Sequence, residues 1–220
     1  MKWELHTHTA QGSSCGKLSA AEVVFEHKQA GYSGIVITDH YNAINIMQMH
    51  GKGIVDKIDS WLKGYEEALK AGNELGVTVL FGTEARVADS DNDFLMYGIE
   101  PEFFYENPTL TNLDLPSFSE LAKRYNALVI QAHPNRHGIC FPVNPIYVDG
   151  YEVYSGNRRQ DNRNELSIDM MKDMPGMIQT SGSDYHQVDD LDMGSMEFET
   201  DIRTSAQLIA CLRNGDFKRT

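Results

Sequence analysis

The sequence predicts an α/β fold built on a parallel sheet, and two observations support this prediction. Short apolar segments rich in β-branched residues alternate with segments of helical periodicity, an order typical of strand–helix units. The short segments are apolar almost without interruption, as expected for strands buried on both faces of a sheet. A doubly wound open sheet and a closed barrel both fit this pattern, and periodicity does not choose between them.

Seven segments have the composition of strands, and the helices between them carry their own signals. The strand segments are residues 3–6, 34–38, 77–81, 94–99, 127–131, 150–154 and 177–181. Three pairs have the spacing of a capping box at a helix start: Ser19 with Glu22, Ser117 with Glu120, and Thr204 with Gln207. The longest helical pattern, Ile54–Leu75, repeats apolar residues at i, i+3 and i+4 and is followed by Gly76, which is typical of a helix end.

The composition fits one globular domain over residues 1–220. Hydrophobic residues make up 41% of the chain and charged residues 23%, and there is no repeat or Pro/Gly/Ser-rich linker. No apolar run approaches the roughly 20 residues that cross a bilayer, so we expect no membrane partner. The start, MKWELHTH, has no apolar signal segment, which makes a cytoplasmic location the default expectation.

The charge balance limits the partners. The chain has 32 acidic and 19 basic residues, a formal net charge of −13. Such a surface repels a phosphate backbone, so we expect no nucleic-acid partner, whereas a small anion remains compatible with a local cluster of cations. The three cysteines, Cys15, Cys140 and Cys211, are far apart and odd in number, which is typical of a reducing compartment.

Polar side chains gather where the predicted strands end. Five of the eight histidines do so: His6, His8, His40, His133 and His186. Because the carboxyl ends of parallel strands converge on one rim, we expect these side chains to meet there. Residues two apart on an extended chain point the same way, so each of the H-x-H and D-x-H motifs presents both side chains together. Imidazole with carboxylate suits Zn²⁺, Mn²⁺ or Fe²⁺, and the sequence therefore predicts a metal site.

These motifs resemble those of the PHP family, which is named for the polymerase and histidinol phosphatase domains. The matching segments are, in order, LHTHT, ITDHYN, GTEAR, QAHPNR and SGSDYH. The resemblance covers essentially the whole chain. It implies a distorted seven-stranded (β/α)7 barrel of the TIM-like kind, two or three divalent ions (Zn, Mn or Fe), and hydrolysis of a small phosphorylated substrate by activated water.

The resemblance also implies roles for the matching residues. His6, His8 and Asp184 would bind a first metal, Glu84 would bridge two metals, and His133 would bind the second. His40 and His186 would bind a third metal or, without that ion, act as acid–base catalysts.

Two positions depart from the commonest family pattern. Asp93 stands where many members have a histidine, and a carboxylate there remains an oxygen ligand. Cys15 stands where members often have an aspartate or histidine. It would bind a third ion as a thiolate or leave that ion one ligand short.

Other residues near the motifs suggest supporting roles. Arginine matches phosphate with two parallel hydrogen bonds, so Arg136, Arg158 and Arg159 on two predicted rim loops are candidate substrate ligands, although arginines are common in exposed loops. Asp39 is interpreted as a hydrogen-bond partner of a ligand rather than a ligand itself. Glu152 would support the site or form an interior ion pair.

Several alternatives stay open from the sequence. His27 shares a helical face with two valines and is interpreted as a packed core histidine. The apolar loop around Met47 is equally compatible with a lid, a buried loop or a contact in a homo-oligomer. The function remains open to hydrolysis of an amide or lactone by the same metals, or to a regulatory module that metal ions only stabilise.

Overall fold

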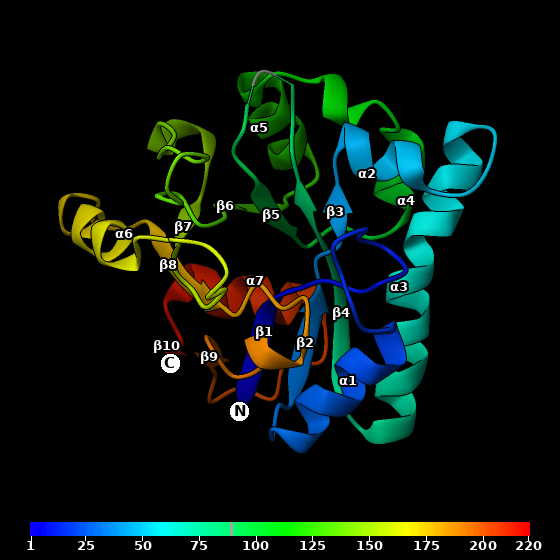
Figure 1. Ribbon diagram of the computed structural model, residues 1–220. Coiled ribbons are helices and arrows are strands. Elements are labelled where there is room, and N and C mark those ends of the chain that lie inside the picture. Colours follow the sequence, from blue (N-terminus) through cyan, green and yellow to red (C-terminus); the bar gives the residue numbers. More distant parts are fainter. Residues whose placement is uncertain (89) are drawn as a thin grey trace.

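A computed structural model describes residues 1–88 and 90–220, and it confirms the α/β fold (Figure 1). The described residues form one mixed sheet of ten strands. The strands are β1 (Lys2–Thr7), β2 (Gly34–Ile37), β3 (His40–Tyr41), β4 (Thr78–Ala85), β5 (Phe94–Tyr97), β6 (Leu128–Gln131), β7 (Gly150–Ser155), β8 (Ile178–Gly182), β9 (Met196–Glu197) and β10 (Lys218–Arg219). The helices are α1 (Ala20–Gln29), α2 (Ala43–Gln48), α3 (Ile54–Leu75), α4 (Glu102–Glu106), α5 (Leu115–Arg124), α6 (Asn164–Met170) and α7 (Ser205–Asn214).

The sheet curves into a nearly closed barrel. The strands pair in the order β10-β9-β1-β2-β4-β5-β6-β7-β8, and β3 pairs with β4. Beyond β8 the chain returns to β1, where Tyr185 forms a parallel bridge with Thr7. The N–H of Tyr185 donates to the carbonyl of His6 at 3.0 Å, and the N–H of His8 donates to the carbonyl of Tyr185 at 2.9 Å. The barrel thus approaches closure beside the first two predicted metal ligands.

The regular repeat of seven parallel strand–helix units is not confirmed. All seven predicted segments contain strands, but β5 runs antiparallel to both β4 and β6. The described residues between β4 and β5 form no helix, so the chain turns straight back instead of crossing over. This reversal has a consequence for the site. The start of β5, with Asp93 before it, lies at the same rim as the carboxyl ends of the parallel strands.

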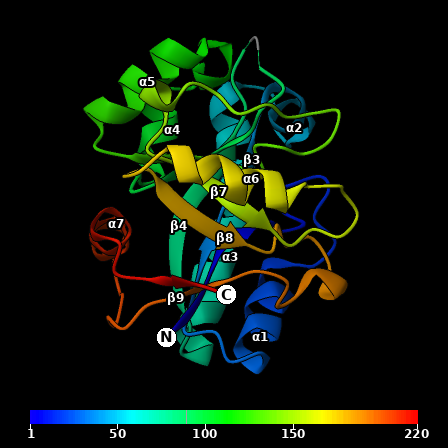
Figure 2. The ribbon, with the colours of Figure 1, turned by 90° about the vertical axis from the view of Figure 1, so that its left-hand side faces the viewer.

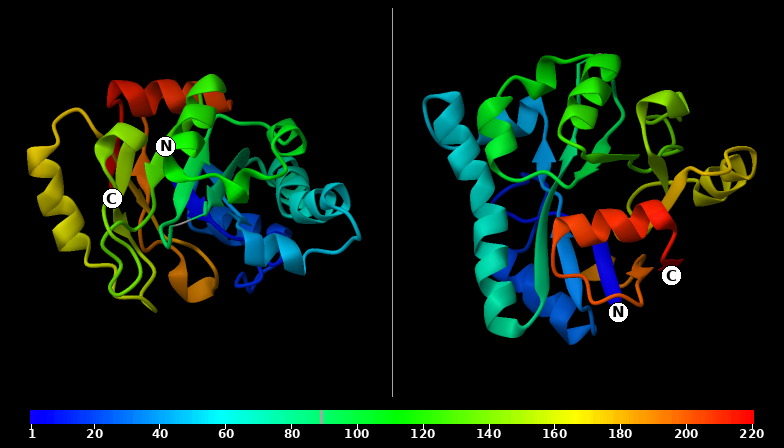
Figure 3. Two further views of the ribbon diagram at one scale, coloured as in Figure 1. Left: turned by 90° about the horizontal axis from the view of Figure 1, so that it is seen from above. Right: turned by 180° about the vertical axis from the view of Figure 1, so that it is seen from behind.

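Helices cover the barrel on several sides (Figures 1 and 2). Helix α3 has the predicted bounds, and its Trp61 packs against Phe81 of β4 and Phe104 of α4. Helix α7 lies in front of β1 and β2 in the rear view (Figure 3, right) and buries Leu208 and Leu212 in the same cluster as Trp3. Each such side chain contributes roughly 1.5–3 kcal/mol of transfer free energy, so the cores on both sides fix the strands that carry the rim.

Two of the three predicted capping boxes are confirmed, at Ser19 and Thr204. The third is wrong, because α5 begins one turn earlier. Asp114 accepts a hydrogen bond from the N–H of Ser117 at 2.9 Å, and Pro116 occupies the first turn, where its missing N–H costs no hydrogen bond. No helix among the described residues combines the length and the apolar character needed to span a membrane.

Candidate metal centre

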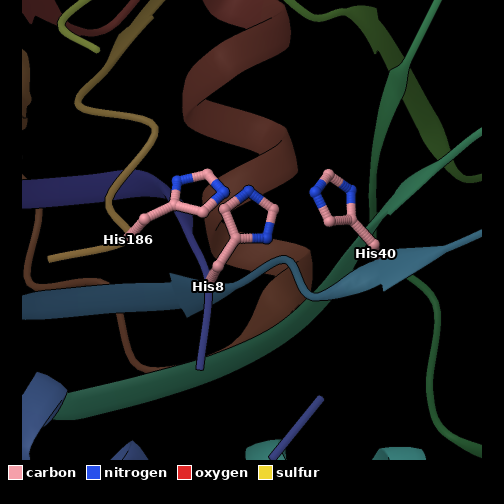
Figure 4. Close-up of side chains that lie close together, drawn as sticks. All are labelled: His8, His40 and His186. Atoms are coloured by element: carbon pink, nitrogen blue, oxygen red, sulfur yellow. The ribbon is translucent and has the colours of Figure 1, made fainter. Parts of the chain in front are cut away.

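The rim brings together five histidines from distant parts of the chain. His6 lies on β1, His8 directly after it and His40 on β3, while His133 and His186 follow β6 and β8. Figure 4 shows three of these imidazoles gathered at one point, and their ligand nitrogens lie within 4.8 Å of one another. The predicted convergence of the strand-end histidines is therefore observed.

Glu84 is the carboxylate that faces most of these imidazoles. It is fully buried near the end of β4, which extends four residues beyond the predicted segment. Its Oε2 lies 3.3 Å from Nε2 of His6 and of His8 and 2.9 Å from Nδ1 of His40. Its Oε1 lies 3.0 Å from Nε2 of His133. The pairing of β3 with β4 sets His40 directly opposite Glu84. Oε2 of Glu84 therefore faces three imidazoles, and Oε1 faces a fourth.

Asp184 is a second carboxylate that faces the imidazoles of His6 and His8. Its Oδ1 lies 3.5 Å from Nε2 of His6 and 3.3 Å from Nε2 of His8, matching the 3.3 Å from Oε2 of Glu84 to the same two nitrogens. Metal–ligand bonds of about 2.0–2.1 Å in tetrahedral geometry place neighbouring ligand atoms roughly 3.4 Å apart. These four separations between imidazole nitrogens and carboxylate oxygens are close to that value, and His6, His8 and Glu84 offer ligand atoms that all lie within 4.8 Å of one another.

Unpaired polar atoms provide an independent test of this fit. Among the described residues, Nε2 of His6, Nε2 of His8 and Oε2 of Glu84 are buried without a hydrogen-bond partner. Leaving such atoms unpaired costs about 1–3 kcal/mol each, so native proteins rarely tolerate several in one place. A cation bound between them would satisfy all three. The donor set therefore fits a divalent metal ion.

The outer nitrogens of the ligands are held by the protein. Nδ1 of His6 lies 2.9 Å from Oε1 of Glu152, and Nδ1 of His186 lies 2.8 Å from the carbonyl of Asp184. Nδ1 of His8 lies 3.2 Å from the hydroxyl of Ser13, which in turn donates to Asp39 at 2.7 Å. With a proton on each Nδ1, each Nε2 carries the lone pair that a metal needs. Asp39 is thus connected to His8 through the Ser13 hydroxyl, and its role as the hydrogen-bond partner of a ligand remains a prediction.

The buried charges stabilise one another. Burial opposes charge on His6, yet Glu152, Glu84 and Asp184 raise its pKa well above the usual value. Burial likewise opposes charge on Glu84, yet His6, His40 and His133 hold its pKa well below the usual value. The carboxylates thus favour the protonated form of the His6 imidazole. A metal ion would displace this proton, which makes metal affinity dependent on pH.

Cys15 and Asp93, the two departures from the family pattern, both lie at this centre. Sγ of Cys15 is 3.2 Å from Nε2 of His186. Burial opposes ionisation of this thiol, but hydrogen bonds with His186 and His40 and the charges of His8 and His40 lower its pKa to about 5. Asp93 offers a ligand atom beside His40 and Glu84, but its oxygens also accept from Nε and Nη2 of Arg86, at 2.8 and 2.7 Å.

The three candidate arginines have different surroundings. The guanidinium of Arg136 is largely buried and donates to Oδ2 of Asp184 at 2.6 Å and to Asn162 at 2.8 Å. Arg159 pairs with Asp190 at 2.8 Å, whereas Arg158 is exposed. Arg136 is therefore the arginine that the fold brings into the centre. A substrate-binding role for any of the three remains a prediction.

Several supporting residues were missed from the sequence. Glu4 accepts from the N–H of His6 at 2.9 Å and from the hydroxyl of Ser183 at 2.6 Å. Asn157 donates to Oδ2 of Asp184 at 3.0 Å, and Arg86 binds Asp93. Glu4 alone had a signal in the sequence, because it is a charged residue two positions before His6 on an otherwise apolar strand and so shares its face.

Two of the predicted ligands have a backbone conformation that non-glycine residues seldom adopt. His133 has φ of 30° and Asp184 has φ of 51°. Non-glycine residues in the left-handed region store roughly 1–3 kcal/mol of strain each, and such residues cluster at functional sites. The surrounding hydrogen bonds must therefore hold these two ligands in place.

Comparison with protein families gives one match. Residues 4–193 match the PHP domain family. A search of curated proteins finds no similar sequence.

Solved structures with a similar fold include proteins from two bacteria and one archaeon. A two-domain protein from Bacteroides vulgatus, described as containing a predicted PHP-like metal-dependent phosphoesterase, is 16% identical with a TM-score of 0.74; the alignment covers 100% of this chain and 64% of that one. An amidohydrolase from Chromobacterium violaceum with bound sulfate is 14% identical (TM-score 0.60; 100% and 98% covered). A lesion-specific endonuclease from Pyrococcus furiosus is 14% identical (TM-score 0.67; 99% and 57% covered).

Proposed function

The chain belongs to the PHP domain family, and from this premise we propose that it is a metal-dependent phosphoesterase acting on a small phosphorylated metabolite. The observation that carries the proposal is the buried Glu84, whose two oxygens face separate groups of histidines with unpaired nitrogens beside them. Two neighbouring ions form an arrangement that phosphatases and nucleases use for phosphoester hydrolysis.

The residues of the first position would be His6, His8, Asp184 and Oε2 of Glu84, while Oε1 of Glu84 and His133 belong to the second. Divalent ions bound there would activate water and offset the charge on phosphoryl oxygens. His40 and His186 stand farther toward the mouth, with side chains 19% and 7% exposed. They are the groups placed to give a proton to the leaving oxygen or to bind a third ion with Cys15.

Arg136 favours an anionic substrate. It places a permanent positive charge directly beside Asp184, and guanidinium matches phosphate geometry. The formal charge of −13 disfavours long nucleic acids, so the proposed substrate is a small phosphomonoester such as histidinol phosphate or a nucleotide phosphate. Whether the physiological ion is Zn, Mn or Fe is part of the same test.

The solved neighbours define which activities the test must separate, because they are described as a predicted phosphoesterase, an amidohydrolase and an endonuclease. Phosphate release is measured on phosphomonoesters and diesters, and hydrolysis on amides, lactones and oligonucleotides. The protein is loaded beforehand with Mn²⁺, Zn²⁺ or Fe²⁺. We expect turnover of at least one phosphomonoester, lost in His6→Ala and kept in Arg203→Gln, a surface arginine paired with Asp201. No phosphate release from metal-loaded protein would overturn the proposal.

A further inference from the structure

One buried carboxylate, Glu152, lies behind ligands of both metal positions. It stands on β7 and is 1% exposed. Its Oε1 is 2.9 Å from Nδ1 of His6, and its Oε2 accepts the backbone N–H of His133 at 3.0 Å. These two histidines face different oxygens of Glu84, His6 at 3.3 Å from Oε2 and His133 at 3.0 Å from Oε1. Glu152 is therefore a strut between one ligand of each position.

We propose that Glu152 couples the filling of the two metal positions, so that the first divalent ion to bind prepares the position that remains. The inference rests on the metal centre of the proposed function and assigns a positioning residue to it. An ion on Nε2 of His6 withdraws electron density from the ring, which strengthens the hydrogen bond from Nδ1 to Glu152. The carboxylate is then held more firmly, and with it the oxygen that binds His133.

The other end of the strut meets a residue that needs support. His133 has φ of 30°, a conformation that a non-glycine residue keeps only when its surroundings enforce it. Its backbone is tied at its N–H by Glu152 and at its carbonyl by the N–H of Arg136, at 3.0 Å each. Fixing the carboxylate therefore fixes the direction of the His133 imidazole. The second ion then meets a ligand that is already ordered, which is positive cooperativity.

The fold leaves a defined space for this carboxylate. Gly182 on β8 faces Glu152, and a Cβ at that position would stand 2.9 Å from Oε1 of Glu152 and 2.7 Å from Cβ of His6. The pairing of β7 with β8 also shifts register between Glu152 and Tyr154, an irregularity that re-aims side chains. Backbone geometry on two strands is thus consistent with a dedicated place for the strut.

Glu4 provides a matched control within the same chain. It is also buried and also contacts His6, but it does so by accepting from the backbone N–H of His6 at 2.9 Å, and its other hydrogen bonds are with Ser183. The substitutions Glu152→Gln and Glu4→Gln are isosteric and remove one carboxylate each. Only Glu152→Gln breaks the connection between His6 and His133, because Gln has one acceptor oxygen and cannot accept from Nδ1–H of His6 and from the N–H of His133 at the same time.

The test is a titration of metal-free protein with Co²⁺, in which visible absorption and equilibrium dialysis measure the binding of the ion. We expect two ions to bind to the unchanged protein, and Glu152→Gln to raise the ratio of the second to the first dissociation constant roughly tenfold. Glu4→Gln should leave that ratio unchanged. Glu84 also links the two positions, but it is intact in both variants, so the difference between them isolates the strut.

Hydrogen exchange provides a second measurement, and it does not depend on the ratio of the two dissociation constants. One equivalent of Co²⁺ should slow exchange of the His133 amide in the unchanged protein and in Glu4→Gln, but not in Glu152→Gln. Where Glu152→Gln does not fold, Gly182→Ala displaces the same carboxylate and should raise the same ratio. An unchanged ratio and unchanged exchange in a folded variant would overturn the inference. Failure of the unchanged protein to bind Co²⁺ would instead overturn the metal centre itself.

Discussion

His6 and His27 are equally buried, and their electrostatic environments are opposite. Both side chains are inaccessible to solvent. Around His6, three carboxylates outweigh burial and raise the pKa well above its usual value. On α1, burial lowers the pKa of His27 to about 4, while its Nδ1–H donates to the carbonyl of Val23 at 2.8 Å. Burial alone therefore does not distinguish a ligand from a core histidine, whereas the charges around each one do.

This contrast explains what the rim is built to hold. A carboxylate buried without compensation is costly, and the rim buries Glu84, Glu152 and Asp184 together. These carboxylates raise the pKa of His6, and its protonated form would offset part of this charge. In the core around His27 the neutral imidazole packs between the rings of Tyr32 and Tyr185, with centroids 4.9 and 4.7 Å away. The first region favours cations, and the second favours the neutral form of its imidazole.

The largest effect is expected where the contrast is removed at the rim itself. Glu84→Gln keeps the shape of the side chain but loses the charge that faces four imidazoles. We expect metal content to fall and phosphate release to drop about 1,000-fold, equivalent to roughly 4 kcal/mol of transition-state stabilisation. Elemental analysis and turnover measure the two effects. Full metal content with full activity would show that the rim does not depend on Glu84.

The next prediction tests the core histidine through acid stability. Between pH 6.5 and 4 the unfolded chain protonates residue 27 while the folded chain keeps His27 neutral, so the free energy of unfolding falls as the pH falls. The full contribution is about 3 kcal/mol. His27→Phe should remove it and flatten the acid limb of a denaturation series.

A neighbouring carboxylate makes comparison with the variant necessary. Burial raises the pKa of Glu4 to about 7, and its Oε2 lies 4.0 Å from Nε2 of His27. A raised carboxylate pKa stabilises the folded chain as the pH falls, which is the opposite slope over an overlapping range. The difference between the two proteins therefore carries the result. Identical acid limbs would contradict a neutral buried His27.

A smaller effect is expected from the arginine beside the rim. Arg136→Gln removes a positive charge and a 2.6 Å hydrogen bond from Oδ2 of Asp184. Asp184 would then orient less well, and we expect kcat/KM to fall about 30-fold, or roughly 2 kcal/mol. Arg203→Gln is the control, since its partner Asp201 is exposed. Equal effects of the two variants would place Arg136 outside the site.

The smallest effect concerns the thiol at the edge of the rim. With a pKa lowered to about 5, Cys15 should react with iodoacetamide at pH 6.5 in metal-free protein, whereas burial raises the pKa of Cys140 to about 12 and keeps it inert. Zn²⁺ should slow alkylation of Cys15 about tenfold if the thiolate is a ligand. Peptide mapping by mass spectrometry identifies the modified residue. Alkylation unaffected by Zn²⁺ would show that Cys15 does not bind the ion.

The gathering of polar side chains at the rim could be predicted from the sequence, because side chains at the ends of neighbouring strands lie at one edge of the sheet. His6, His8 and Glu84 follow from alternation along a strand and from the convergence of strands at one edge. The reversal of β5 was beyond such reasoning, because a short apolar segment reads the same in both directions. Asp93 was therefore placed correctly at the rim while the reason for its position was missed.

Loops and long-range partners were the harder part. Arg136, Arg158 and Arg159 look alike in the sequence, but their surroundings in the fold differ. The guanidinium of Arg136 is largely buried, Arg159 pairs with Asp190, and Arg158 is exposed. Loop conformation depends on contacts with distant segments, which no local pattern encodes. Glu152 was left between two roles for the same reason, since its partners lie 146 and 19 residues away.

The near-closure of the barrel also determines when, during synthesis of the chain, the parts of the rim can come together. His6 emerges from the ribosome long before Asp184, the second carboxylate proposed for the first position, and the bridge from Tyr185 to Thr7 forms only after both have emerged. A growing chain thus carries its H-x-H motif before the proposed ligand set is complete. On the proposed function, metal selection is a property of the folded barrel, and ions that meet the nascent chain find an incomplete set of ligands.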